Sequence, residues 1–139
     1  MEKGFEAIPT AEGWQLSNAP VLAMAAHKAS LDVFEEAGIF NLHAKRKMLS
    51  DYLLFIIDYC NSKFDEKIIK VITPRNENER GCQVSMLMLK KGKEIFNELT
   101  KQGVLADWRE PNVIRVAPVP LYNKFEDIYK FGNIIEKLL

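Results

Sequence analysis

The sequence has few cysteines, no surplus of either charge and no long apolar run. Cys60 and Cys82 have no second thiol or histidine at a ligand-like spacing, which favours reduced cysteines over a disulfide or a zinc site. Lysine plus arginine and aspartate plus glutamate each total 19, so there is no basic field to attract nucleic acid. We therefore expect no metal site and no nucleic-acid partner.

Segments that would place the chain in or across a membrane are also missing. Apolar stretches such as residues 20–26 are far shorter than the roughly 20 residues that a membrane-spanning helix needs. The N-terminus shows no apolar segment followed by a small-residue cleavage site, as a secretory signal would. The 139 residues, 47% of them hydrophobic and 27% charged, are typical of one soluble domain, which we expect in the cytoplasm.

The sequence divides into two parts after residue 18. Residues 1–18 contain glycine and proline without sustained periodicity, which predicts an extended arm or linker, and residues 19–139 are expected to form the domain. Residues 20–37 predict a helix that ends at Gly38. The first two turns of this helix are apolar nearly all round, so we expect other elements to cover both sides of it.

The rest of the pattern predicts an α/β sandwich, with a small, mostly antiparallel sheet covered on one side by helices. The expected order is α-α-β-β-α-β-β-α. Helical periodicity, β-branched runs and turn residues give these ranges: helices at 20–37, 41–62, 92–102 and 124–139, and strands at 67–72, 83–89, 104–108 and 112–116.

Local sequence patterns alone suggest roles for several residues. Strand alternation places Arg115 on the face opposite Ile114 and Val116, where composition alone indicates a solvent-facing arginine. Asn18 precedes a predicted helix start, which favours an N-cap role. Gly81 is expected to supply a backbone conformation that other residues resist. His27 and His43 have no carboxylate or cysteine at a catalytic or ligand spacing, so a structural role is expected for each.

Three segments together resemble kynureninase: Gly13-Trp-Gln-Leu-Ser-Asn-Ala-Pro20, Glu79-Arg-Gly-Cys-Gln83 and Asn112-Val-Ile-Arg-Val-Ala-Pro-Val-Pro-Leu-Tyr-Asn123. The resemblance covers nearly the whole chain, and the third segment is the most specific. The resemblance implies the fold of aspartate-aminotransferase-like (fold-type I) pyridoxal-phosphate enzymes. In that fold a large domain carries the cofactor lysine, and a smaller C-terminal domain closes over the substrate. The chain resembles that smaller domain.

The resemblance also implies roles for single residues. Arg115 would grip the α-carboxylate of the substrate through two parallel charge-assisted hydrogen bonds. Asn18 would contact the cofactor phosphate near a helix start, and Ser17 would lie on the substrate side, whereas Trp14 is expected to pack. The role of Arg115 requires that its guanidinium meet a partner domain and not be held by an acidic neighbour.

The cofactor lysine of the family lies upstream of anything in this sequence. Lys3, Lys28 and Lys45 are therefore not candidates for it, and no catalytic residue is expected in this chain. By resemblance, the complete protein would be a homodimeric hydrolase that uses pyridoxal phosphate to cleave the Cβ–Cγ bond of L-kynurenine or 3-hydroxykynurenine, giving anthranilate (or its 3-hydroxy form) and L-alanine. The chain alone should be inactive.

Two alternatives remain open at this point. The first is another fold-type I enzyme, such as a cysteine desulfurase or selenocysteine lyase, although those families lack the run from Val116 to Tyr122. The second is a freestanding, non-catalytic α/β interaction module descended from a kynureninase domain. The coding sequence upstream of Met1 would separate these possibilities, because only the module would lack a large cofactor domain in frame.

Overall fold

The computed structural model describes residue 4 and residues 6–139, and it divides into two units, Met1–Gly38 and Ile39–Leu139. Residues 1–3 and 5, which include Lys3 and the first part of the predicted arm, lie outside the described residues.

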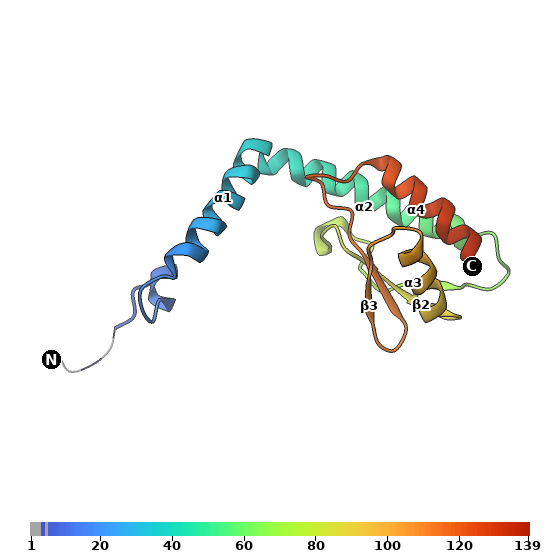
Figure 1. The fold of residues 1–139 in the computed structure, drawn as a ribbon, viewed down its shortest axis with the longest axis horizontal. Coiled ribbons are helices and arrows are strands. Elements are labelled where there is room, and N and C mark those ends of the chain that lie inside the picture. The colour runs from blue at the N-terminus through green and yellow to red at the C-terminus, as the bar shows by residue number, and fades with distance from the viewer. Residues whose placement is uncertain (1–3, 5) are drawn as a thin grey trace. The chain divides into compact units, whose positions relative to one another are not determined.

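The first unit holds a short 3-10 helix, η1 (Ala11–Trp14), and one α-helix, α1 (Val21–Ala37) (Figure 1). Gly38 ends α1 with a φ of 77°, and its N–H donates to the carbonyl oxygens of Phe34 and Glu35, each at 3.1 Å. A positive φ is accessible to glycine at little cost, so the predicted role of Gly38 is confirmed.

Helix α1 buries none of its residues. Its exposed apolar side chains lie on every side of the helix, since they include neighbours in sequence: Val21, Leu22, Met24, Leu31, Val33 and Phe34. A helix with this much exposed apolar surface is not stabilised by the contacts of its own unit.

The second unit contains the sheet and the remaining helices. Its elements are α2 (Ile39–Asn61), β1 (Ile69–Val71), η2 (Glu77–Glu79), β2 (Val84–Met88), α3 (Gly92–Lys101), β3 (Asp107–Arg109), β4 (Val113–Val116) and α4 (Phe125–Leu138). All strand pairs are antiparallel and the strand order is β1-β2-β4-β3. The predicted order of elements and the α/β sandwich are confirmed.

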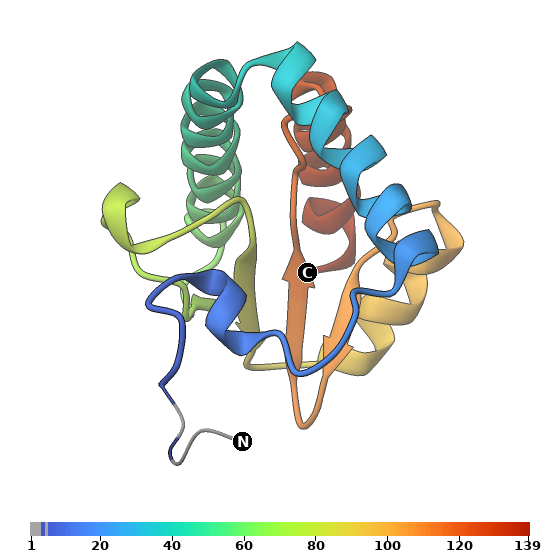
Figure 2. The same ribbon diagram turned by 90° about the vertical axis from the view of Figure 1, so that its left-hand side faces the viewer.

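Helices cover one face of this sheet. Residues alternate between buried and half-buried along β2 and β4, as expected when only one face meets the core. α2 and α4 lie side by side, with α3 next to α4 (Figures 1 and 2). Side chains such as Ile57, Met86, Ile114 and Ile135 are fully buried between these helices and the sheet.

Strand β3 begins later than predicted. Gly103, with a φ of 83°, ends α3, and the Val104 N–H donates to the Leu99 carbonyl oxygen at 2.9 Å. Residue 104 is thus tied to the helix end, and Leu105 is 94% exposed, so pairing with β4 starts only at Asp107. The strands form a hairpin whose turn holds the cis Glu110–Pro111 bond (orange in Figure 2).

Arg80, and not Gly81, holds the segment 79–83 in place. Gly81 has no positive φ, and a Cβ built there would meet no heavy atom within 4 Å, so the expected special conformation of Gly81 is wrong. The Arg80 side chain, by contrast, is only 2% exposed and donates to the Arg75 carbonyl oxygen and the Asp51 carboxylate. Arg80 therefore gives this segment the structural role expected of it.

A close approach of two helices requires glycine at position 132. A Cβ added at Gly132 of α4 would lie 2.6 Å from the Ile56 Cγ2 atom of α2. Gly132→Ala gains about 1 kcal/mol of helix propensity, but overpacking a core typically costs about 1–3 kcal/mol. We expect a net loss of about 1 kcal/mol in the free energy of unfolding, measured by urea denaturation of this chain.

Gly81→Ala is the matched control, because the added methyl group meets open space there. Its free energy of unfolding should stay within about 0.5 kcal/mol of the parent chain. Equal stability of both variants would show that α2 and α4 are not in close contact at Gly132.

Candidate functional site

Arg115 lies on the sheet face that the helices leave uncovered. It is the third residue of β4, between the buried Ile114 and Val116, so its predicted face is confirmed. Its Cα partners are Ser85 on β2 and Asp107 on β3. The Arg115 side chain is 29% exposed, so it is partly shielded from water.

The Arg115 guanidinium contacts a carboxylate. Its Nε atom donates to Oδ2 of Asp107 at 2.6 Å, and its Nη2 atom donates to the same oxygen. Nε of Arg109 also donates to this oxygen, at 3.0 Å. An acidic neighbour therefore holds Arg115, so the expectation that no acidic residue would hold it is wrong. Asp107 occupies the edge formed by Nε and Nη2 and not the end formed by Nη1 and Nη2. The Nη1 atom of Arg115 has no hydrogen-bond partner among the residues that the structure describes.

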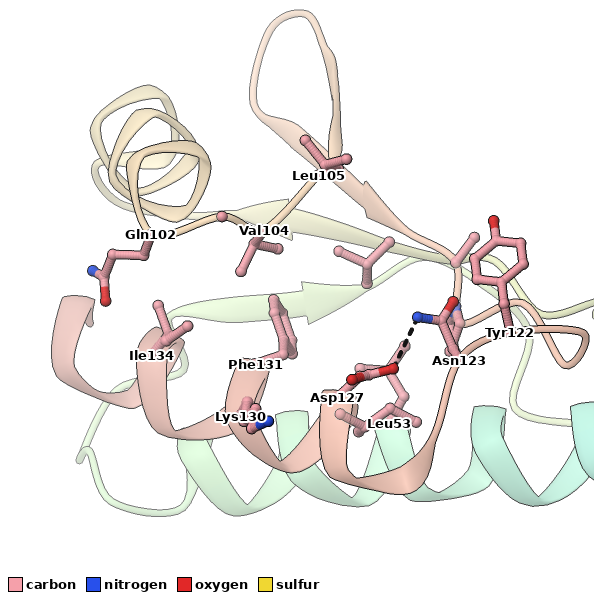
Figure 3. A pocket seen from close by; sticks show the side chains of 15 residues that line it. Leu53, Gln102, Val104, Leu105, Tyr122, Asn123, Asp127, Lys130, Phe131 and Ile134 are labelled. Carbon is pink, nitrogen blue, oxygen red and sulfur yellow. Dashed lines mark hydrogen bonds between the residues drawn. The ribbon is translucent and has the colours of Figure 1, made fainter.

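Arg115 and Asp107 line a shallow hollow of about 360 Å³ on this face. A larger hollow of about 510 Å³ lies beside α4 (Figure 3). The two hollows share Leu105, Ala117 and Tyr122. The larger one is lined mainly by apolar side chains and contains no arginine. Volume therefore does not identify the site, and the arginine distinguishes the smaller hollow.

The wall around Tyr122 is fixed by polar contacts. The Val119 N–H donates to Oδ1 of Asn123 at 2.8 Å, and Nδ2 of Asn123 donates to Asp127 at 3.1 Å, as Figure 3 shows. Nζ of Lys45, on α2, donates to the Pro120 carbonyl oxygen at 2.7 Å. Sequence reasoning missed these roles. The available signal was Asp127 in the first turn of α4, three residues after the N-cap Lys124, whose N–H donates to it.

Ser17 and Asn18 belong to the first unit, and both are exposed. The N-cap of α1 is Pro20, so Asn18 does not cap the helix, and its side chain makes no hydrogen bond with a described residue. The N-cap interpretation of Asn18 is wrong for this reason. Trp14, which was expected to pack, is 88% exposed.

The remaining candidates have ordinary surroundings. Nζ of Lys28 contacts Asp32 at 2.8 Å, and Lys45 bonds the carbonyl described above. His27 and His43 are exposed. Within residue 4 and residues 6–139, no group of three or more histidine, cysteine, aspartate or glutamate side chains could hold a metal ion. No helix in that part of the chain is long and apolar enough to cross a membrane.

The fold and this site define a class: a small α/β domain that covers one sheet face with helices and offers a paired arginine on the other. The chain belongs to the kynureninase family. Residues 42–135 match the model of the kynureninase C-terminal domain. This match decides against the cysteine desulfurase and selenocysteine lyase alternatives.

Curated relatives agree with this assignment. The chain is 48% identical to a kynureninase of Christiangramia forsetii and 45% identical to one of Flavobacterium psychrophilum, in each case over 99% of this chain and 32% of the relative. It is 41% identical to a kynureninase of Mus musculus, over 100% of this chain and 31% of the relative. The chain thus spans about a third of the length of these relatives.

The pairing of Asp107 predicts a pH dependence. The hydrogen bond from Arg115, with further attraction from Arg109, lowers the pKa of the Asp107 carboxyl from its ordinary value of 3.8. Because the folded pKa is the lower one, the pair stabilises the fold above the ordinary value. That contribution is lost as the pH falls through the lowered pKa. A carbon-13 NMR titration of the carboxyl group should show the lowered pKa.

Arg115→Gln should move the pKa of Asp107 upward, because the main donor to the carboxylate is removed. Arg75→Gln is the control, since Arg75 pairs with Asp58 instead. An Asp107 carboxyl that titrates at its ordinary value in the parent chain would mean that the pair is absent in solution.

Proposed function

We propose that this chain is the C-terminal domain of a pyridoxal-phosphate-dependent kynureninase. The complete protein would hydrolyse L-kynurenine or 3-hydroxykynurenine to L-alanine and the matching anthranilate, as a cytoplasmic homodimer. Residues 1–18 would form the arm and residues 19–139 the small domain. The observation that carries this proposal is an arginine on the uncovered sheet face of a domain that belongs to the kynureninase family.

Arg115 would bind the α-carboxylate of the substrate. A guanidinium has two edges that can each offer two parallel N–H donors, and this fork matches the two oxygens of a carboxylate. Asp107 occupies the edge formed by Nε and Nη2. The end formed by Nη1 and Nη2 is available for a second carboxylate.

The residues of the first unit suit a phosphate group. Asn18 is exposed without a hydrogen-bond partner among the described residues, and it stands three residues before α1. The free N–H groups and the dipole at a helix start favour an anion there. When bound, pyridoxal phosphate supplies an electron sink for carbon–carbon cleavage. Asn18 would contact its phosphate, and Ser17 would lie on the substrate side.

The covalent lysine would come from outside this chain, in a large domain. Among the lysines named from the sequence, Lys28 is paired with Asp32, and Lys45 donates to the Pro120 carbonyl oxygen. The apolar surface all round α1 is what a helix needs if another domain packs on it. The chain alone should therefore have no kynureninase activity.

Arg115→Lys in the complete enzyme tests the substrate clamp. Lysine keeps the charge but loses the fork, so we expect kcat/KM for L-kynurenine to fall by about 30- to 1,000-fold, or about 2–4 kcal/mol of transition-state binding. Steady-state kinetics would measure this. Near-normal kcat/KM would remove Arg115 from the site and the proposal with it.

Arg75→Lys is the matched control, because the Arg75 guanidinium also bonds an aspartate, Asp58, but lies outside the cluster around Asp107. Its side chain is 49% exposed, and it should tolerate lysine with little change in kcat/KM.

The surface of α1 gives a test of the proposed second domain. If a domain normally covers α1, the isolated chain should self-associate and bind an apolar dye, since exposed apolar patches drive association. Val21→Ser with Leu22→Ser should weaken both effects, as measured by light scattering and dye fluorescence. Glu36→Ser, a polar change in the same helix, should not.

A parent chain that stays monomeric at high concentration and binds no dye would contradict this expectation. It would favour the freestanding module instead.

A further inference from the structure

We infer that Asp107 is a positioning residue for Arg115: it holds one edge of the guanidinium so that the other end faces an incoming carboxylate. This inference rests on the proposed function, in which Arg115 binds the α-carboxylate of the substrate. It adds a residue that the sequence did not single out and assigns it a task in substrate binding.

The sheet itself sets the geometry of the pair. Asp107 and Arg115 are direct Cα partners across the β3–β4 hairpin, so their side chains leave the same face of the sheet side by side. On the other side of Arg115 stands Ser85, a small residue that cannot reach round the guanidinium. The carboxylate is therefore the neighbour that fixes the long, flexible arginine side chain.

A single oxygen of Asp107 makes the contact. Oδ2 accepts from both Nε and Nη2 of Arg115, which fixes the plane of the guanidinium along its side edge. Nη1 has no partner among the described residues, and Nη2 has a second N–H. These two nitrogens form the end-on fork that a carboxylate can meet with two parallel bonds.

Arg109 offsets the negative charge of Asp107, so the site still attracts an anionic ligand although Asp107 is present. Arg109 donates to the same oxygen as Arg115, so the cluster combines two positive groups with one negative group and carries a net charge of +1. One more carboxylate brings the cluster to neutrality. With Arg115 and Asp107 alone, the cluster would already be neutral, and a substrate carboxylate would gain less from binding.

The opposite interpretation is that Asp107 is a placeholder that blocks Arg115 until substrate displaces it. A placeholder would use the end of the guanidinium that the substrate needs. Asp107 uses the side edge instead and leaves Nη1 open. The two interpretations predict opposite signs, because removing a placeholder should tighten substrate binding and removing a positioning residue should weaken it.

The test is Asp107→Asn in the complete enzyme, which keeps the size of the side chain and removes its charge. We expect KM for L-kynurenine to rise about tenfold while kcat stays within about twofold, because a loosened guanidinium binds the carboxylate less well without changing the reacting atoms. Asp107→Ala, which also removes the acceptor oxygen, should raise KM at least as much.

A pair of competitive inhibitors separates positioning from general damage. 3-Benzoylpropionate has the carbon skeleton and carboxylate of the substrate without its amino groups, and its primary amide lacks the negative charge. Asp107→Asn should raise the inhibition constant of the acid by about tenfold and leave that of the amide within about twofold. A merely structural role of Asp107 would change both constants alike.

Asp58→Asn is the matched control. Asp58 holds Arg75 through two hydrogen bonds of 2.6 and 2.8 Å, and its side chain is 50% exposed, against 47% for Asp107. This variant should leave KM, kcat and both inhibition constants unchanged.

The Arg115 and Asp107 variants test the proposed function and the role of Asp107 separately. If Arg115→Lys impairs the enzyme but Asp107→Asn behaves like Asp58→Asn, or lowers KM, the inference about Asp107 is overturned and the proposed function stands. If Arg115→Lys is itself near normal, both are overturned.

Discussion

The structure of the second unit depends on a sheet that is covered on one face only. Because side chains alternate along a strand, burying Ile114 and Val116 against the helices forces Arg115 to the other face. A shift of register by one residue would place the arginine in the core, at a cost that no partner there could offset. The packing that stabilises the domain therefore also places its charged group on the uncovered face.

The sequence predicted the elements better than their arrangement. Periodicity and turn residues gave the order of helices and strands, because each depends on neighbouring residues. The strand order β1-β2-β4-β3, with β4 between two strands that run parallel to each other, depends on contacts far apart in the sequence. The late start of β3 has a similar cause, since the end of α3 holds Val104 through its backbone.

Prediction of the site was limited in the same way. The face of Arg115 followed from alternation, but its partner Asp107 followed only from the hairpin register. Local sequence patterns do not indicate the role of Arg80, because it comes from contacts with residues of α2 and of the loop before Arg80. Family resemblance supplied the roles of Ser17 and Asn18, which no local pattern could indicate. Those roles stay predictions.

The exposure of Arg115 limits what this face can do by itself. An ion pair that water reaches is worth little, since solvent screens it and the side chains must give up rotamer freedom. The hollow around Arg115 is open, and both partners of the pair are partly exposed. A carboxylate would bind the guanidinium firmly only if another surface covered the hollow and excluded water. The sheet face around Arg115 and the apolar surface of α1 are thus both surfaces that the proposed second domain would cover.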